Sequence, residues 1–173
     1  EAPDWRSVDL HMDGMFYLTA NYIRQIGRKG SYVEFGVFDG RSFSLAYHVF
    51  RNVCDDFFAF DSFQGIIGSR EDERRCFGDS MYFANIETFE HNMRLVGADT
   101  VRIHTIEGAF QKTLTRPPSD YGISSVSVCH IDSDIYEAAY LALSFVEPVL
   151  LNGAMILLDE YHALGCDPNN GER

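Results

Sequence analysis

The stretch VCHIDSDIYEAAY, residues 128–140, places two aspartates, Asp132 and Asp134, between two kinds of apolar pattern. The run before them is short and apolar, as in a strand buried on both faces of a sheet, and the run after them has helical spacing. A carboxylate at the end of a buried strand is costly to desolvate without a partner. The stretch therefore predicts a strand, a turn that carries paired acids, and a helix.

The same alternation of strand and helix continues along the chain. Strands are expected at residues 32–38, 57–63, 101–108, 125–132 and 154–161. Helices are expected at 15–26, 42–52, 86–97, 109–114 and 135–151, with an irregular insertion or lid at 64–85. Such alternation predicts an α/β fold with a mostly parallel sheet and helices on both faces. Ligands of such sheets bind at the carboxyl ends of the strands, so the polar residues there are the candidate site.

Composition narrows the class of protein. The chain has 173 residues, enough for one domain covering 1–173, and a formal net charge of −12. It shows no basic footprint for nucleic acid and no apolar run for a membrane. Four cysteines occur without a CxxC pair, which favours a reducing, cytoplasmic setting over a disulfide scaffold. The sequence begins Glu-Ala-Pro-Asp-Trp without methionine, so we expect it to begin inside a longer chain.

The ends of the first two expected strands suggest a nucleotide-like ligand. The first strand leads into Glu34, Gly36 and Asp39, and the next helix begins near Ser42, whose free N–H groups would face the same edge. The pattern is not GxGxxG, which argues against a nicotinamide dinucleotide. Asp61 closes the second strand, where a carboxylate can accept hydrogen bonds from a ribose diol. Taken singly, a tight turn explains the first pattern equally well, and a helix cap or solvated loop explains Asp61.

Carboxylates also gather at the ends of the fourth and fifth expected strands. Asp132 ends the fourth strand, and Asp159 with Glu160 ends the fifth. Acids that converge on adjacent strand ends repel one another unless a proton or a cation lies between them, and oxygen ligands suit Mg²⁺ or a similar divalent ion. Asp134 fits a cap on the following helix better than a metal ligand. His162 is the preferred histidine for a site, since a strand histidine such as His130 is more often packed.

Four segments together resemble a known family. VEFGVFDGRS, FAFDSFQG, HIDSDIYEAAYLAL and VEPVLLNGAMILLDEY are similar, in order and over about residues 32–162, to the macrocin O-methyltransferase (TylF-like) family. The resemblance implies a Rossmann-like class I methyltransferase fold and metal ligands at Asp132, Asp159 and Glu160. The family has Asp-Asp where this sequence has Asp159-Glu160. The resemblance further implies S-adenosylmethionine contacts, which fall on Glu34, Gly36, Asp39, Ser42, Asp61, Ser62, Phe63, Glu107 and Gly108.

The activity implied by this resemblance is metal-assisted methyl transfer to a hydroxyl of a sugar-containing or polyol small molecule. Asp132 or His162 would accept the hydroxyl proton. The main alternative is a non-catalytic module that binds S-adenosylmethionine or a partner protein, and a metal-dependent hydrolase is a third reading. The family fold adds two strands after the fifth, so we expect the outer edge of residues 154–158 to be covered, by further chain or in a homo-oligomer.

Overall fold

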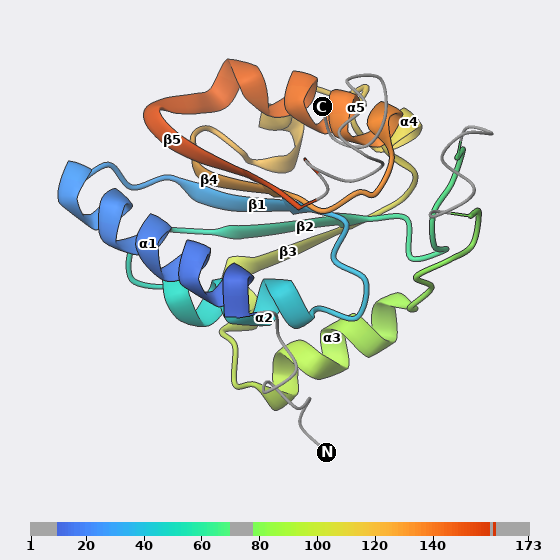
Figure 1. The fold of residues 1–173 in the computed structure, drawn as a ribbon, viewed down its shortest axis with the longest axis horizontal. Coiled ribbons are helices and arrows are strands. Elements are labelled where there is room, and N and C mark those ends of the chain that lie inside the picture. The colour runs from blue at the N-terminus through green and yellow to red at the C-terminus, as the bar shows by residue number, and fades with distance from the viewer. Residues whose placement is uncertain (1–9, 70–77, 160, 162–173) are drawn as a thin grey trace.

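The computed structural model describes residues 10–69, 78–159 and 161. They form one five-stranded sheet in the order β3-β2-β1-β4-β5, and every neighbouring pair of strands is parallel. Helices α1, α2 and α3 lie on one face of this sheet and α4 and α5 on the other (Figure 1). The α/β fold with a parallel sheet and two helical layers is therefore confirmed.

The elements follow the predicted alternation. The strands are β1 Ser31–Phe35, β2 Phe57–Asp61, β3 Ile103–Glu107, β4 Val126–Ile131 and β5 Leu150–Leu158. The helices are α1 Leu10–Ile26, α2 Arg41–Phe50, α3 Ile86–Leu95, α4 Phe110–Thr113 and α5 Tyr136–Val146. Short 3₁₀ turns, η3 Thr100–Arg102, η4 Pro118–Tyr121 and η5 Glu147–Val149, join them.

The two faces of the sheet bury separate apolar clusters. Under α1, α2 and α3, the aromatic rings of Tyr32, Phe43 and Phe57 pack against one another. Under α4 and α5, Phe35 packs against Phe60, with ring centroids 5.0 Å apart. Every residue of β1 and β4 is buried, which explains why their sequences are mostly apolar without regular alternation, and why their polar residues, such as Glu34 and His130, are buried as well.

The end of the fifth helix was predicted wrongly. Residues 147–151 were expected to continue the helix, but α5 ends at Val146, the 3₁₀ turn η5 follows, and β5 begins at Leu150. Pro148 explains the difference, since it lacks the N–H that an α-helix interior needs. β5 pairs with β4 on one side and is an edge of the described sheet, with Ile156 39 % exposed.

The described parts of the expected insertion, 64–69 and 78–85, contain no helix or strand. Three hydrogen bonds join these two parts, and we call the residues that make them, Ile66, Ser69, Asp79, Ser80 and Met81, the neck of the segment. The N–H of Ile66 donates to the carbonyl of Met81 at 3.0 Å, and the N–H of Ser80 donates to the carbonyl of Ile66 at 2.9 Å. The N–H of Ser69 donates to Asp79 Oδ1 at 3.0 Å. Within the described residues, no helix combines the length and the apolar character needed to cross a membrane.

Candidate functional site

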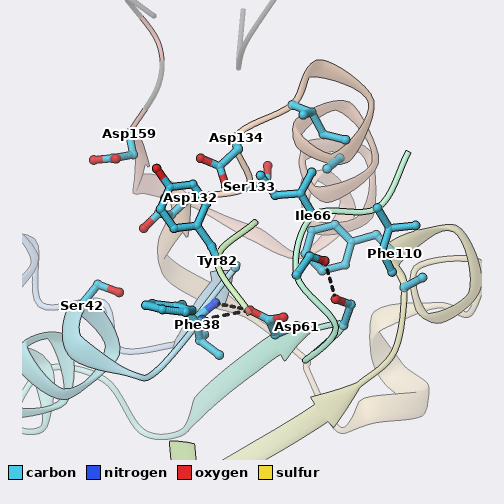
Figure 2. A pocket seen from close by; sticks show the side chains of 18 of the residues that line it. Phe38, Ser42, Asp61, Ile66, Tyr82, Phe110, Asp132, Ser133, Asp134 and Asp159 are labelled. Carbon is cyan, nitrogen blue, oxygen red and sulfur yellow. Dashed lines mark hydrogen bonds between the residues drawn. The ribbon is translucent and has the colours of Figure 1, made fainter. Parts of the chain in front are cut away.

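A cavity of about 380 Å³ opens at the carboxyl ends of the strands. It lies beside the point where the strand order reverses, since β1 has β2 on one side and β4 on the other. This is the position at which open α/β sheets bind ligands, and the volume is in the range of small-molecule sites. Figure 2 shows the side chains that line it.

Gly36 turns the chain out of β1 with φ +86°. A Cβ atom at this position would lie 1.8 Å from the carbonyl oxygen of Asp132, so only glycine allows the ends of β1 and β4 to approach this closely. The prediction assigned Gly36 to close approach of a ligand. The structure shows that the first requirement for glycine here is packing between strand ends, although Gly36 also lines the cavity.

Asp61 holds the loop that follows β1. Its Oδ2 accepts hydrogen bonds from the N–H groups of Val37 and Phe38, at 2.8 and 2.9 Å, and its Oδ1 accepts one from Phe63 at 2.8 Å. Burial raises the pKa of Asp61, and these backbone donors oppose that rise. The carboxylate is therefore a structural clamp as well as a lining group of the cavity (Figure 2).

Glu34 lies beneath the cavity and is not among the residues that line it. Its side chain is fully buried, accepts hydrogen bonds from the hydroxyls of Tyr32 and Ser42, and lies 3.5 Å from Nδ1 of His130. Burial lowers the pKa of His130, but the adjacent carboxylate of Glu34 more than offsets this and raises it to about 9. Side chains alternate along a strand, so Glu34 and Tyr32 share the face covered by α1 and α2.

Three aspartates from β4, its following turn and β5 line the other end of the cavity: Asp132, Asp134 and Asp159 (Figure 2). Burial raises the pKa of Asp132 well above its usual value; His130 opposes this rise and the charge of Asp159 adds to it. Burial, with the charges of Asp159 and Asp61, raises the pKa of Asp134 to about 7. Carboxylates in this state favour a proton or a cation among them.

Asp134 is not the helix cap that the sequence favoured. The N-cap of α5 is Ile135, no side chain caps this helix, and Asp134 itself has φ +64°. The turn therefore directs its carboxylate into the cavity rather than toward the helix end.

The predicted metal set is only partly described. Asp132 and Asp159 line the cavity, whereas Glu160 and the predicted base His162 lie outside the described residues. Within the part of the chain that the structure describes, no three His, Cys, Asp or Glu side chains are grouped closely enough to hold a metal ion.

The structure places the predicted site residues in two groups. Those that line the cavity are Gly36, Asp39, Ser42, Asp61, Ser62, Asp132 and Asp159. Those that do not are Glu34, Phe63, Glu107 and Gly108. Sequence reasoning missed the apolar wall, which includes Phe38, Ile66, Tyr82 and Phe110. The aromatic residues of 64–85 and the FGVF motif could have indicated this wall, but neither shows whether a ring points into the cavity.

Together, a parallel sheet of this strand order and a cavity at its switch point, lined by carboxylates and an apolar wall, define a Rossmann-like ligand-binding domain. A family model for a methyltransferase domain matches residues 33–161, which is most of the chain, and the protein belongs to that family. This match supports the methyltransferase assignment made from the sequence without distinguishing the TylF-like family within it. A comparison with curated protein sequences gave no significant match.

Solved structures of O-methyltransferases share the fold. The O-methyltransferase NovP superposes with a TM-score of 0.72 at 21 % identity, over 83 % of this chain and 62 % of NovP. The calicheamicin methyltransferase CalS11 superposes with a TM-score of 0.71 at 19 % identity, over 89 % of this chain and 66 % of CalS11. Apo CalS11, described as a TDP-rhamnose 3′-O-methyltransferase, gives a TM-score of 0.57 at 18 % identity, over 88 % of this chain and 66 % of that one. The chain thus spans less than two thirds of the length of these proteins.

Proposed function

We propose that this domain transfers a methyl group from S-adenosylmethionine to a hydroxyl of a sugar-containing or polyol small molecule. The observation that carries the proposal is the cavity itself. At the end of β2 it has Asp61, a carboxylate placed where it could bind a ribose. At the ends of β4 and β5 it has three further carboxylates, Asp132, Asp134 and Asp159. The family match and the O-methyltransferase neighbours, one of which acts on a nucleotide-linked sugar by its description, support it.

The residues at the first end fit S-adenosylmethionine. Helix α2 begins at Arg41, whose N–H donates to Asp39 Oδ1 at 3.3 Å, and its N-cap Gly40 has no side chain to cap it. Ser42 in the first turn lines the cavity, so its backbone N–H suits the carboxylate of the methionine part. Asp61 Oδ1 accepts one backbone hydrogen bond where Oδ2 accepts two, and is the less engaged oxygen for a ribose hydroxyl. Ser62 lies beside it in the cavity wall.

The donor chemistry at the second end fits a divalent cation such as Mg²⁺. We propose that Asp132, Asp159 and Glu160 hold it, with Asp134 as a further carboxylate of the same cavity. All are oxygen ligands of the kind that Mg²⁺ prefers. Burial is the main cause of the raised pKa values of Asp132 and Asp134, and the charge of Asp159 adds to both. When bound, the ion would lower the pKa of the acceptor hydroxyl.

The chain's own groups then have distinct tasks. Asp132 or His162 would take the proton of the acceptor hydroxyl. The acceptor oxygen bonds to the methyl carbon as the bond between that carbon and sulfur breaks. The clamp of Asp61 on Val37 and Phe38 fixes the loop beside the reacting groups, and such positioning supplies much of the rate in group transfer.

Calorimetry with S-adenosylhomocysteine in the presence of Mg²⁺ tests the cofactor assignment. Wild type should bind, and Asp61→Ala should bind at least about tenfold more weakly because both the clamp and the ribose partner are lost. Thermal melting during Mg²⁺ or Mn²⁺ titration tests the metal assignment, with stabilisation expected for wild type and not for Asp159→Asn. Absence of S-adenosylhomocysteine binding by wild type would overturn the proposed function.

The cellular location and the partner molecule of the domain stay predictions. Cys54 and Cys129 are buried and form no disulfide within the described residues, and we propose a cytoplasmic location on that basis. The proposed partner is a small-molecule hydroxyl acceptor.

A further inference from the structure

Two aromatic side chains from different segments meet at the cavity. Phe38 follows β1, and Tyr82 belongs to the segment between β2 and α3; their ring centroids lie 6.1 Å apart with an interplanar angle of 83°. Both line the cavity, and both are exposed, by 38 % and 52 % respectively. We call this pair the aromatic corner (Figure 2).

The geometry of the aromatic corner suits a cation. When one ring stands edge-on against the face of another, the space beside the pair is bounded by the faces of both rings. The face of an aromatic ring carries negative electrostatic potential and attracts a cation within about 6 Å of its centre. Large apolar side chains are normally buried, so two exposed rings that converge on a cavity are candidates for binding a ligand.

The backbone fixes both rings in an unfavourable conformation. Phe38 has φ +47° and Tyr82 has φ +53°, a region that bulky residues rarely adopt. Phe38 is held there by the hydrogen bond from its N–H to Asp61, and Tyr82 follows Met81, whose carbonyl accepts the N–H of Ile66. Strain of this kind persists where the surrounding structure imposes it, and it is concentrated at ligand-binding positions.

The charges around the aromatic corner also favour a cation. Five carboxylates line the same cavity, Asp39, Asp61, Asp132, Asp134 and Asp159, so a divalent ion among the last three would still leave acids in excess. Arg41 is the basic residue among the lining groups, and its Nε lies 3.2 Å from Asp39. The arginine charge is therefore already paired.

We propose that the aromatic corner binds the sulfonium group of S-adenosylmethionine through cation–π contacts, so that the domain distinguishes the charged cofactor from its neutral product. This inference rests on the proposed function and adds two positioning residues to it. Transfer of the methyl group leaves a neutral thioether, and the attraction to the ring faces is then lost. The aromatic corner would thus favour release of S-adenosylhomocysteine.

The test compares the affinities of S-adenosylmethionine and S-adenosylhomocysteine by calorimetry, at one fixed Mg²⁺ concentration, in wild type, Phe38→Leu and Tyr82→Leu. Leucine keeps an apolar side chain and removes the π face. Each variant should lose about 2- to 30-fold in affinity for S-adenosylmethionine and much less for S-adenosylhomocysteine. Tyr82→Phe should behave as wild type because the π face remains.

Phe83→Leu is the matched control, since Phe83 is the next residue, is 61 % exposed and does not line the cavity. It should change neither affinity. Thermal melting of each variant checks that the fold is intact, and the ratio of the two affinities is insensitive to a partly unfolded fraction. An equal loss for both ligands, or no loss for either, would overturn the inference. Failure of wild type to bind S-adenosylhomocysteine would instead overturn the proposed function.

Discussion

At the scale of single residues, Asp61 connects the cofactor end of the cavity to the loop that carries Phe38. It accepts three backbone hydrogen bonds, from Val37, Phe38 and Phe63. A ribose contact alone would not require this arrangement. The same carboxylate therefore determines where the aromatic corner lies and how the loop after β1 is shaped.

Asp61→Asn should lower the free energy of unfolding by about 1–3 kcal/mol and weaken S-adenosylhomocysteine binding. An amide has a single acceptor oxygen, so at least one of the three N–H donors would face an NH₂ group instead. Chemical denaturation and calorimetry measure the two effects. The control is Asp56→Asn, because Asp56 lies just before the opposite end of β2 and pairs at the surface with His104. An equal loss of unfolding free energy in both variants would show that the hydrogen bonds of Asp61 to the backbone do not stabilise the loop.

The acidic end of the cavity predicts an unusual pH dependence. The pKa of Asp134 is raised to about 7 and that of Asp132 is raised well above its usual value. Between pH 4 and 7 the folded chain thus binds more protons than the unfolded chain, so stability falls as pH rises through this window. Without divalent ions, the Tm at pH 5.5 should exceed that at pH 7.5 by about 4 °C.

Asp134→Asn should flatten this dependence, because the titrating carboxylate is gone, and should raise the Tm at pH 7.5. Differential scanning calorimetry of both proteins in EDTA measures the change. His48 contributes with the opposite sign, since burial lowers its pKa, and His130 contributes with the same sign above about pH 6.5, since its pKa is raised to about 9. Both are common to the two proteins. Parallel curves for wild type and variant would show that Asp134 does not titrate in this window.

At the scale of elements, α3 holds the loop after β1 in place through a hydrogen bond and close packing. The side chain of Asn92 donates to the carbonyl of Asp39 at 2.8 Å. A Cβ atom at Gly40 would lie 2.7 Å from Met93 Cε and 2.9 Å from Phe89, so the loop and the helix are in close contact. The stability of α3 therefore contributes to the shape of the cavity.

Asn85 begins this helix, and its Oδ1 accepts the N–H of Thr88 at 2.8 Å. Asn85→Ala should lower the free energy of unfolding by about 1 kcal/mol, as the loss of a helix N-cap usually does. Asn85→Asp, which keeps the acceptor and places a negative charge at the helix start, should be neutral or stabilising. Urea denaturation of the three proteins measures this, and an Asp variant as unstable as the Ala variant would contradict the capping role.

The sequence was sufficient to predict the helices and strands and the acidic residues that line the cavity. Apolar runs identified the strands, and parallel topology brought Asp61, Asp132 and Asp159 to one edge without further information. The sequence did not show that Glu34 is buried under α1 and α2, because a strand buried on both faces carries no alternation that shows which way a side chain points. Its contact with S-adenosylmethionine stays a prediction. Phe38, Tyr82 and Asp134 depend on positive φ angles, which are rare for aromatic residues and, although commoner for aspartate, are not predicted by residue type alone.

At the scale of the whole molecule, we expect the exposed side of β5 to govern association. β5 is an edge of the described sheet, and Ile156 on it is 39 % exposed. Unpaired N–H and C=O groups beside apolar side chains are a template for pairing with another chain. The prediction that further chain or a second subunit covers this edge stays open.

Ile156→Lys should reduce self-association of the 173-residue chain, since a charged side chain on an edge strand opposes pairing. Light scattering across a concentration series measures the effect. Val101→Lys is the control, because Val101 is 84 % exposed and lies outside the strands. Equal self-association of the two variants would show that the chain does not associate through β5.

The neck formed by Ile66, Ser69, Asp79, Ser80 and Met81 has a consequence for how such domains diversify. Because its hydrogen bonds hold residues 66–69 and 79–81 together, we expect insertions between Ser69 and Asp79 to have little effect on the sheet. In general, doubling the length of chain between two fixed ends costs only about 0.6 kcal/mol. Sequence can therefore be inserted or exchanged here next to the binding cavity, and grafted loops at this position are a direct route to domains that accept different molecules.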